Sequence, residues 1–169
     1  MDSDFLLIQK MKNGDEQALE SFVRKYYPMI LQYCRLHIHD FGHAEDITQD
    51  TFERFFRTFE EYRHYGKAAN YLYVIAANAC KDYYKKKREP AMNPLPEQEG
   101  CAIENLENWM DIRTSLDNLP QEYREVAILF FFQERTQKEI AKILGIGLPL
   151  VKYRIKKARE MLRKYLFIS

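Results

Sequence analysis

Basic side chains crowd the end of this chain. From residue 136 to residue 169, nine lysines and arginines face two glutamates, a local charge of +7 in a protein whose net charge is +1. Lysine and arginine at this density neutralise phosphates, and the polar and aromatic side chains between them can reach base edges. The segment therefore predicts nucleic-acid binding. A solvated helical hairpin that its lysines merely keep soluble is the alternative that the charge alone leaves open.

A second basic group occupies residues 78–88 and contains two adjacent tyrosines. Asn78, Lys81, Asp82 and Lys85 share one outer face at helical spacing. Bases stack on aromatic rings while lysines meet phosphates, so this mixture is typical of a surface for single-stranded or partly melted nucleic acid. A basic helix end with snorkelling lysines and buried tyrosines is the alternative interpretation.

Other chemistry finds less support. Cys34, His37, His39 and His43 are zinc-ligand types, but on a continuous helix only Cys34 and His37 share a face. We interpret them as a buried thiol and ordinary surface histidines, and we expect no metal. The chain has no GxxxxGK[ST] or GxGxxG motif and no clustered nucleophile–base spacing, so it predicts neither an enzyme nor a cofactor. Three widely spaced cysteines do not predict a disulfide framework.

A tight turn between two helices must position the C-terminal basic residues. Thr136 and Glu139 have the spacing of a capping box, and Gly145 suits the left-handed conformation that ends a helix. Gly147 and Pro149 can open the second helix as cap and first-turn proline. A helix-turn-helix with a basic second helix is typical of a reader of the DNA major groove.

Apolar periodicity predicts which faces of these two helices are buried. In the first helix we expect a stripe of Ile140, Ala141 and Leu144. In the second we expect the inward residues Val151, Ile155, Ala158 and Leu162. The run from residue 128 to residue 132 should pack against this helix-turn-helix.

The rest of the chain predicts further helices. Periodic segments near residues 5–11, 15–27, 29–39, 44–59, 71–88, 103–119 and 120–130 are helical in pattern, and Pro28 should end or kink the second of them. Residues 89–102 contain three prolines and no periodicity, which indicates a flexible linker. We therefore predict an all-α fold with two small helical domains, residues 1–88 and 103–169. No apolar run approaches the roughly 20 residues that span a bilayer, so we expect a cytoplasmic protein without membrane insertion of its own.

Five motifs in order resemble the bacterial extracytoplasmic-function (ECF) sigma factors over nearly the full chain. They are GDEQALESFVRKYYPMI, AEDITQDTFERFFR, YLYVIAANACKDYYKKKR, LPQEYREVAILFFFQERTQKEIAKILGI and VKYRIKKAREMLR. The resemblance implies sigma region two in the first domain and sigma region four, with the helix-turn-helix, in the second. It implies a protein without catalysis that binds core RNA polymerase through the clamp coiled coil and the flap, recognises promoter DNA and helps to open it.

The resemblance also implies site residues. The polymerase clamp would be bound by Asp46, Gln49, Asp50 and Arg54. A flipped base of the −10 element would be captured by the loop from Arg63 to Asn70 together with Asn78, Lys81 and Lys85. The −35 element would be read by Lys152, Tyr153, Lys156 and Lys157, with Arg154 expected to meet phosphate.

The chain departs from the family pattern at the start of its last helix. Tyr153 stands where relatives usually have a small hydroxyl residue, and residues 147–150 read Gly-Leu-Pro-Leu in place of a Ser-x-Gly-Thr-like entry. A −35 preference is therefore not transferred from relatives. Many relatives are held by an anti-sigma factor, and we expect one here, although the sequence identifies neither this partner nor the promoter. An ordinary helix-turn-helix regulator that binds duplex DNA without being a polymerase subunit is the alternative function.

Overall fold

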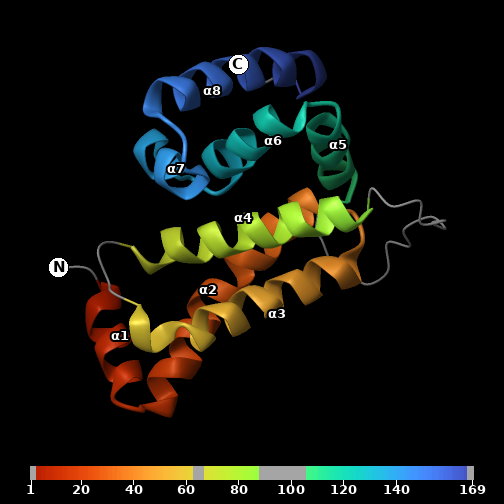
Figure 1. The fold of residues 1–169 in the computed structure, drawn as a ribbon. Coiled ribbons are helices and arrows are strands. Elements are labelled where there is room, and N and C mark those ends of the chain that lie inside the picture. The colour runs from red at the N-terminus through yellow and green to blue at the C-terminus, as the bar shows by residue number, and fades with distance from the viewer. Residues whose placement is uncertain (1–2, 63–66, 88–105, 167–169) are drawn as a thin grey trace. The chain divides into compact units, whose positions relative to one another are not determined.

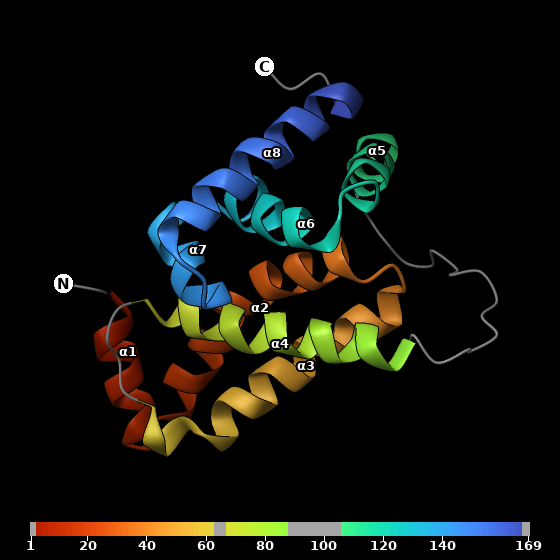
Figure 2. The ribbon, with the colours of Figure 1, turned by 45° about the horizontal axis from the view of Figure 1, so that its top comes forward.

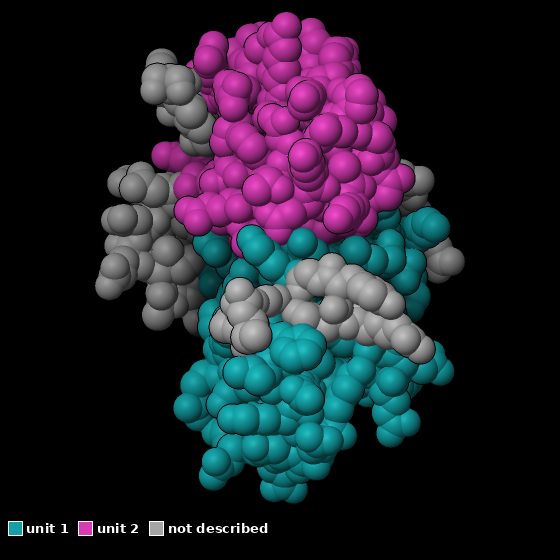
Figure 3. Space-filling model, turned by 90° about the vertical axis from the view of Figure 1, so that its left-hand side faces the viewer, with its two compact units in different colours: residues 1–97 teal, residues 98–169 magenta. Residues whose placement is uncertain are grey.

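The computed structural model describes residues 3–62, 67–87 and 106–166 (Figure 1). The chain divides into two compact units, which Figure 3 colours separately: unit 1 is Met1–Glu97 and unit 2 is Gln98–Ser169. The described residues are helices and short connections, with no strand among them, which confirms the all-α prediction. The predicted linker, residues 89–102, lies outside the described residues. Within the described part of the chain no helix is long and apolar enough to cross a membrane.

The described residues of unit 1 form a bundle of four helices. They are α1 (Ser3–Lys12), α2 (Glu16–His37), α3 (Phe41–Arg57) and α4 (Ala68–Lys87), with the 3-10 turn η1 (Phe59–Glu61) after α3. Helices α2, α3 and α4 pack against one another side by side, and α1 packs on α2 (Figures 1 and 2). Asp15 and Asp40 cap α2 and α3. Their carboxylates accept hydrogen bonds from backbone N–H groups of the first turn that have no partner within the helix.

An aromatic cluster forms one end of this bundle. The Phe22 ring of α2 stacks on the Phe55 ring of α3 with centroids 5.0 Å apart, and both side chains are fully buried. Phe55 also contacts Tyr62 and Tyr71, at 5.4 and 5.7 Å between centroids. Aromatic rings bury large apolar areas and prefer such tilted or offset contacts, so the cluster holds Tyr62 and the start of α4 against α2 and α3.

Helix α4 approaches its neighbours through small side chains. Five alanines are buried on it, at residues 68, 69, 76, 77 and 79, together with Leu72, Tyr73 and Cys80. Leu72, Ala76 and Ala79 are buried as predicted, whereas Ile75 and Tyr83 are only half-buried. The outer side of α4 is left to polar residues, of which Asn78, Asp82 and Lys85 are exposed.

A buried carboxylate attaches α1 to α2. Asp4 is 2% exposed and accepts hydrogen bonds from the Tyr26 hydroxyl and from Lys25 Nζ, the latter at 2.7 Å. Charged groups are almost never buried without such partners, since desolvation would otherwise exclude them. Gly14, with φ +85°, then ends the connection after α1. The prediction of a short helix near residues 5–11 is confirmed.

The prediction that Pro28 interrupts the second helix is wrong in one respect, because α2 does not end there but continues to His37. Proline removes one N–H donor and deprives the carbonyl of residue 24 of its partner. Residues 24 and 28 are both exposed, so that carbonyl faces water, which can satisfy it. Packing of the turns on either side against α3 and α4 then favours a continuous helix.

Unit 2 contains α5 (Leu106–Asp117), α6 (Gln121–Ala127), the π-helical segment η2 (Ile128–Phe132), α7 (Gln137–Leu144) and α8 (Leu148–Leu166). Helix α8 packs on α5, α6 and α7. The end of α5 is closed by Arg124 of α6, which donates hydrogen bonds to the carbonyls of Leu116 and Leu119 at 3.0 and 2.9 Å. Ile128 and Leu129 are fully buried, and η2 contacts α7 as predicted.

Candidate nucleic-acid interface

The turn between α7 and α8 is built as its sequence predicts. Thr136 Oγ1 accepts the backbone N–H of Glu139 at 3.1 Å, and the Glu139 carboxylate accepts the N–H of Thr136 at 3.1 Å, so the capping box is complete. Gly145 has φ +66°, and Ile146 N donates to the carbonyl of Ala141 at 3.1 Å. These bonds satisfy both ends of α7 and fix the direction in which α8 leaves it.

The buried stripe of α7 differs from the prediction. Ile140 is buried as expected, but the second buried residue is Ile143, while Ala141 and Leu144 are half-buried. Residues three apart and four apart lie almost equally close on a helix surface. The periodicity alone therefore could not show to which side of Ile140 the partner helix lies.

On α8 the separation of faces is as predicted. Val151, Ile155, Ala158 and Leu162 are each at most 2% exposed. Lys152, Tyr153 and Lys156 are exposed on the opposite side of the same helix. A helix held by one apolar stripe presents these three side chains outward in a fixed register, which is what insertion into a DNA major groove requires.

The two other predicted −35 residues lie on the flanks of this face. Arg154 is largely covered, with its side chain 19% exposed, and its guanidinium lies 3.7 Å from the Glu122 carboxylate of α6. Lys157 lies 3.7 Å from Glu160, and its ammonium lies 5.8 Å from the centroid of the Tyr153 ring. Both cations therefore have internal partners, whereas Lys152 and Lys156 extend from the exposed face.

A tyrosine pair joins α6 to the recognition helix. Partial burial raises the pKa of Tyr123, and the nearby Tyr153 side chain raises it further. Tyr123 is half-buried, while the Tyr153 side chain is 51% exposed. The two side chains are therefore neighbours where α8 packs on α6.

A groove of about 520 Å³ lies where α7 and α8 begin. Its lining residues are Phe130, Thr136, Gln137, Lys138, Leu148 and Lys152. Both helices direct their N-terminal ends, with partial positive charge, toward this region. Lys138 and Gln137 were not predicted as site residues. Their position directly after the Thr136 cap was the available signal.

On unit 1, the predicted polymerase-contact residues lie along α3. Asp46 and Gln49 are exposed. Arg54 Nε pairs with Asp50 Oδ2 at 2.9 Å, and its Nη1 lies 3.9 Å from Asp82 Oδ2 on α4. Arg54 therefore connects the polar face of α3 to the outer face of α4.

The predicted −10 residues on helix α4 differ in their exposure to solvent. Asn78 and Lys85 are exposed, Lys81 is half-buried, and the backbone N–H of Asn70 donates to the carbonyl of Lys67 at 3.1 Å. Arg63 lies outside the described residues. Of the two tyrosines in the basic group, Tyr83 contacts His43, with 3.1 Å between the hydroxyl and Nδ1. Burial raises the pKa of Tyr83, and the charge of Asp40 raises it further.

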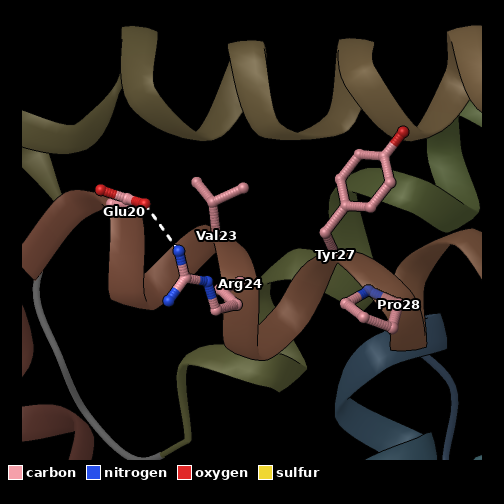
Figure 4. Close-up of a pocket in the computed structure, with 5 residues that line it drawn as sticks. All are labelled: Glu20, Val23, Arg24, Tyr27 and Pro28. Atoms are coloured by element: carbon pink, nitrogen blue, oxygen red, sulfur yellow. Dashed lines mark hydrogen bonds and ion pairs between the residues drawn. The ribbon is translucent and has the colours of Figure 1, made fainter.

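An apolar hollow of about 390 Å³ runs along α2 beside α3 (Figure 4). Its lining residues are Glu20, Val23, Arg24, Tyr27 and Pro28. Val23 and Tyr27 point toward α3, where the Tyr27 ring lies 5.8 Å from that of Phe52, and an Arg24–Glu20 ion pair at 2.7 Å borders the hollow. This hollow could not be predicted from the sequence, because it depends on how α3 packs beside α2.

Of the four candidate metal ligands, Cys34 and His37 are buried, His39 is half-buried and His43 is exposed, so the prediction of surface histidines is wrong for His37. Within the described ranges no three His, Cys, Asp or Glu side chains converge on one point. Cys34 and Cys80 are buried free thiols. A hydrogen bond with Cys80 lowers the pKa of Cys34 against the opposing effect of burial, and Thr48 lowers it further.

Two helical units, one with a basic helix-turn-helix and one with a second basic surface, define a DNA-binding transcription protein. Comparison with known families is more specific. Residues 22–89 match the Sigma-70 region 2 model, and residues 109–162 match the Sigma-70, region 4 model. The chain is 31% identical to the ECF RNA polymerase sigma factor SigW of Bacillus subtilis, over 94% of both chains. It is 30% identical to the ECF RNA polymerase sigma factor SigE of Mycolicibacterium smegmatis, over 90% of this chain and 64% of that protein.

Solved structures show the same fold. CnrH in complex with the cytosolic domain of CnrY matches with a TM-score of 0.79 and 22% identity, over 98% of each chain. Bartonella quintana RpoE in complex with the anti-sigma factor NepR matches with a TM-score of 0.74 and 19% identity, over 89% of this chain and 98% of that one.

The chain belongs to the ECF family of RNA polymerase sigma factors. It is an alternative sigma factor, a non-enzymatic initiation protein that directs promoter recognition, as the motif order predicted. The family assignment sets aside the alternative of a helix-turn-helix regulator independent of polymerase. It does not by itself assign roles to individual side chains.

Proposed function

We propose that the two units divide promoter recognition between them. Unit 2 reads the −35 element with α8, while unit 1 binds the clamp coiled coil of core RNA polymerase with α3 and captures an unstacked −10 base beside α4. The observation that carries this proposal is the outward face of α8, where Lys152, Tyr153 and Lys156 are exposed behind a fully buried apolar stripe. Unit 2 also contacts the polymerase flap in this proposal.

The −35 contacts fall into two groups by exposure. The exposed Lys152 and Tyr153 face base edges in the major groove, because the first turns of a recognition helix enter it most deeply. Lys156, which is also exposed one turn further along α8, neutralises a phosphate. Arg154 and Lys157, on the flanks, meet phosphates after loosening their internal ion pairs. Lys138 and the N–H groups at the start of α7 add phosphate contacts from the groove described above.

The polymerase contact rests on exposed polar groups that the bundle does not use. Asp46 and Gln49 extend from α3 into solvent, where a partner helix can bind them. Asp50 and Arg54 are 41% and 39% exposed and pair with each other at 2.9 Å, so they offer the partner a fixed ionic contact rather than two mobile side chains. Charged groups that are complementary across an interface contribute specificity more than raw affinity.

The −10 contact rests on the outer face of α4 and on the loop before it. Asn78 can bond a base edge, while Lys81 and Lys85 neutralise phosphates of the strand being opened. Asn70, which lies in the first turn of α4 rather than in a loop, would contact the extruded base from there. Extrusion costs a few kcal/mol of unstacking, which these contacts offset.

The proposal includes a cytoplasmic location and an anti-sigma partner. The location follows from the polymerase on which sigma factors act. The partner is inferred from the solved relatives, whose structures hold an anti-sigma factor or the cytosolic domain of CnrY. A protein that covers the polymerase-binding face and the DNA-binding face of a sigma factor prevents it from initiating transcription.

In vitro transcription tests this proposal. Purified core polymerase, with and without the protein, transcribes fragmented genomic DNA, and the transcript starts are mapped. Discrete new starts that share two upstream elements support the proposal. Absence of polymerase binding would refute it.

A matched pair of variants tests the clamp assignment. Asp46→Ala with Gln49→Ala should weaken polymerase binding and leave thermal unfolding unchanged, since both side chains are exposed. Glu16→Ala with Gln17→Ala removes the same chemical groups from the exposed start of α2 and serves as the control. Equal affinities for the two double variants would remove α3 from the interface.

Opening of the −10 element is tested with a premelted template. Asn78→Ala with Lys85→Ala should reduce transcription from a duplex promoter and recover most of it on a template with a −10 bubble, where unstacking is already complete. An equal defect on both templates would show that these residues do not act in opening.

A further inference from the structure

Two apolar side chains are exposed at the start of the recognition helix. Leu150 is 39% exposed and Tyr153 is 51% exposed, and they belong to the small set of large apolar side chains that the described structure leaves this open to solvent. They stand three residues apart, so they are neighbours on the surface of α8. An apolar patch here is unexpected on a helix otherwise surrounded by lysine and arginine.

The position of this patch restricts what it can contact. The first turns of a recognition helix approach base edges, whereas phosphates are contacted by charged side chains and backbone N–H groups. Lys152 and Lys156 border the patch and Lys157 lies over the Tyr153 ring at 5.8 Å, so the occupant is surrounded by positive charge. A polyanion with an apolar group in its groove fits this arrangement, and the apolar group of the DNA major groove is the C5 methyl of thymine.

The Tyr153 ring is also held in place. Lys157 Nζ lies 5.8 Å from the centroid of this ring, and the next residue, Arg154, lies 3.7 Å from Glu122 of α6. Tyr153 is also close enough to Tyr123 of α6 to raise the pKa of that residue. The start of α8 therefore lies against α6 at this point, while the Tyr153 side chain is 51% exposed and remains available to meet DNA.

We propose that Leu150 and Tyr153 read thymine methyl groups in the −35 element, and that Tyr123 acts as a positioning residue that orients the Tyr153 ring. This inference rests on the proposed role of α8. It assigns the element at least one A·T base pair, with the thymine methyl facing the first turn of α8. Both residues lie where the chain departs from the pattern usual among its relatives, so we expect this preference for thymine to differ from the −35 preference of those relatives.

Replacement of thymine by deoxyuridine tests the proposal, because it removes the methyl group and leaves every hydrogen-bonding group of the base. Each thymine of the −35 element mapped by in vitro transcription is replaced singly, and the affinity of the holoenzyme is measured by competition at constant salt. Wild-type protein should lose about fourfold in affinity at one or two positions, the loss expected for one buried methyl group.

Protein variants then identify the reader of each methyl. Leu150→Ala and Tyr153→Ala should each abolish the difference between thymine and deoxyuridine at one position, and both should fold because the side chains are exposed. Tyr123→Phe should reduce the difference at the Tyr153 position while thermal unfolding stays close to that of the wild type. Lys156→Ala, the control, should weaken binding to both templates and leave their ratio unchanged.

Two results would overturn the inference: a ratio of one at every thymine in the wild type, or a ratio that Leu150→Ala and Tyr153→Ala leave intact. A mapped −35 element without an A·T pair would do the same. These outcomes differ from a failure of the proposed function, in which the holoenzyme would show no promoter-dependent binding and Lys156→Ala would have no effect.

Discussion

Removal of the Thr136 cap should destabilise unit 2 by about 1 kcal/mol. Thr136→Ala deletes the acceptor of the Glu139 N–H and leaves the carboxylate that bonds the Thr136 N–H without its reciprocal partner. Loss of an N-cap hydroxyl costs about 0.5–2 kcal/mol. Helix α7 has 8 residues, fewer than an isolated helix needs in water, so its ends contribute much of its stability. For a domain of this size, 1 kcal/mol corresponds to a decrease of about 4–8 °C in Tm.

The assay can separate unit 2 from unit 1 in the full chain. Hydrogen exchange measured by mass spectrometry during heating, on peptides from α7 and α8, reports on unit 2. Thr136→Ser keeps the hydroxyl acceptor and should remain within about 1 °C of the wild type. The reasoning is refuted if Thr136→Ala unfolds with the wild-type midpoint, or if Thr136→Ser loses as much stability as Thr136→Ala.

Three further changes have expected outcomes. Asp4→Ala should lower the free energy of unfolding of unit 1 by about 1.5–3 kcal/mol, because a lysine and a tyrosine hydroxyl converge on this buried carboxylate. Urea unfolding followed by circular dichroism measures this change. Glu20→Ala, which removes an exposed ion pair, is the control and should change the free energy of unfolding by less than about 1 kcal/mol. Gly145→Ala should cost unit 2 about 1–2 kcal/mol in the same measurement, since its φ of +66° strains any residue with a Cβ. Lys156→Ala should lower the slope of log affinity against log salt by about 0.9, so that a fourfold rise in salt costs about 3.5-fold less affinity than in the wild type. Arg154→Ala should change this slope less, because the Arg154 guanidinium already has a carboxylate partner. Equal slopes for the two variants would contradict this ranking.

Features that depend on a few adjacent residues could be predicted from the sequence. The capping box at Thr136, the left-handed Gly145 and the inward stripe of α8 each follow from local spacing and local backbone preference. The exposed faces of α3 and α8 follow from the same periodicity, because a residue opposite the apolar stripe has nowhere to go but solvent.

Features that depend on a residue far away in the sequence could not be predicted from it. The sequence does not show that Arg124 closes the end of α5, that Arg54 reaches Asp82 across two helices, or that Tyr123 meets Tyr153. Each of these contacts joins residues on different helices, so it exists only once the helices have packed. The continuation of α2 through Pro28 has the same origin, since contacts on both sides of the proline outweigh one missing hydrogen bond.

The separation of faces on α8 has an evolutionary consequence. The side chains that hold the helix, such as Val151 and Ile155, are buried, whereas those that face outward, such as Lys152 and Lys156, are exposed. Substitutions of exposed side chains usually change stability by less than about 0.5 kcal/mol, so the outward positions can vary while the stability of the domain is retained. Lineages derived from this chain can therefore acquire new promoter preferences by single outward substitutions, and duplicated copies can diverge in regulon without first passing through an unstable protein. Arg154 is the exception, because its pairing with α6 couples any change there to the packing of the domain.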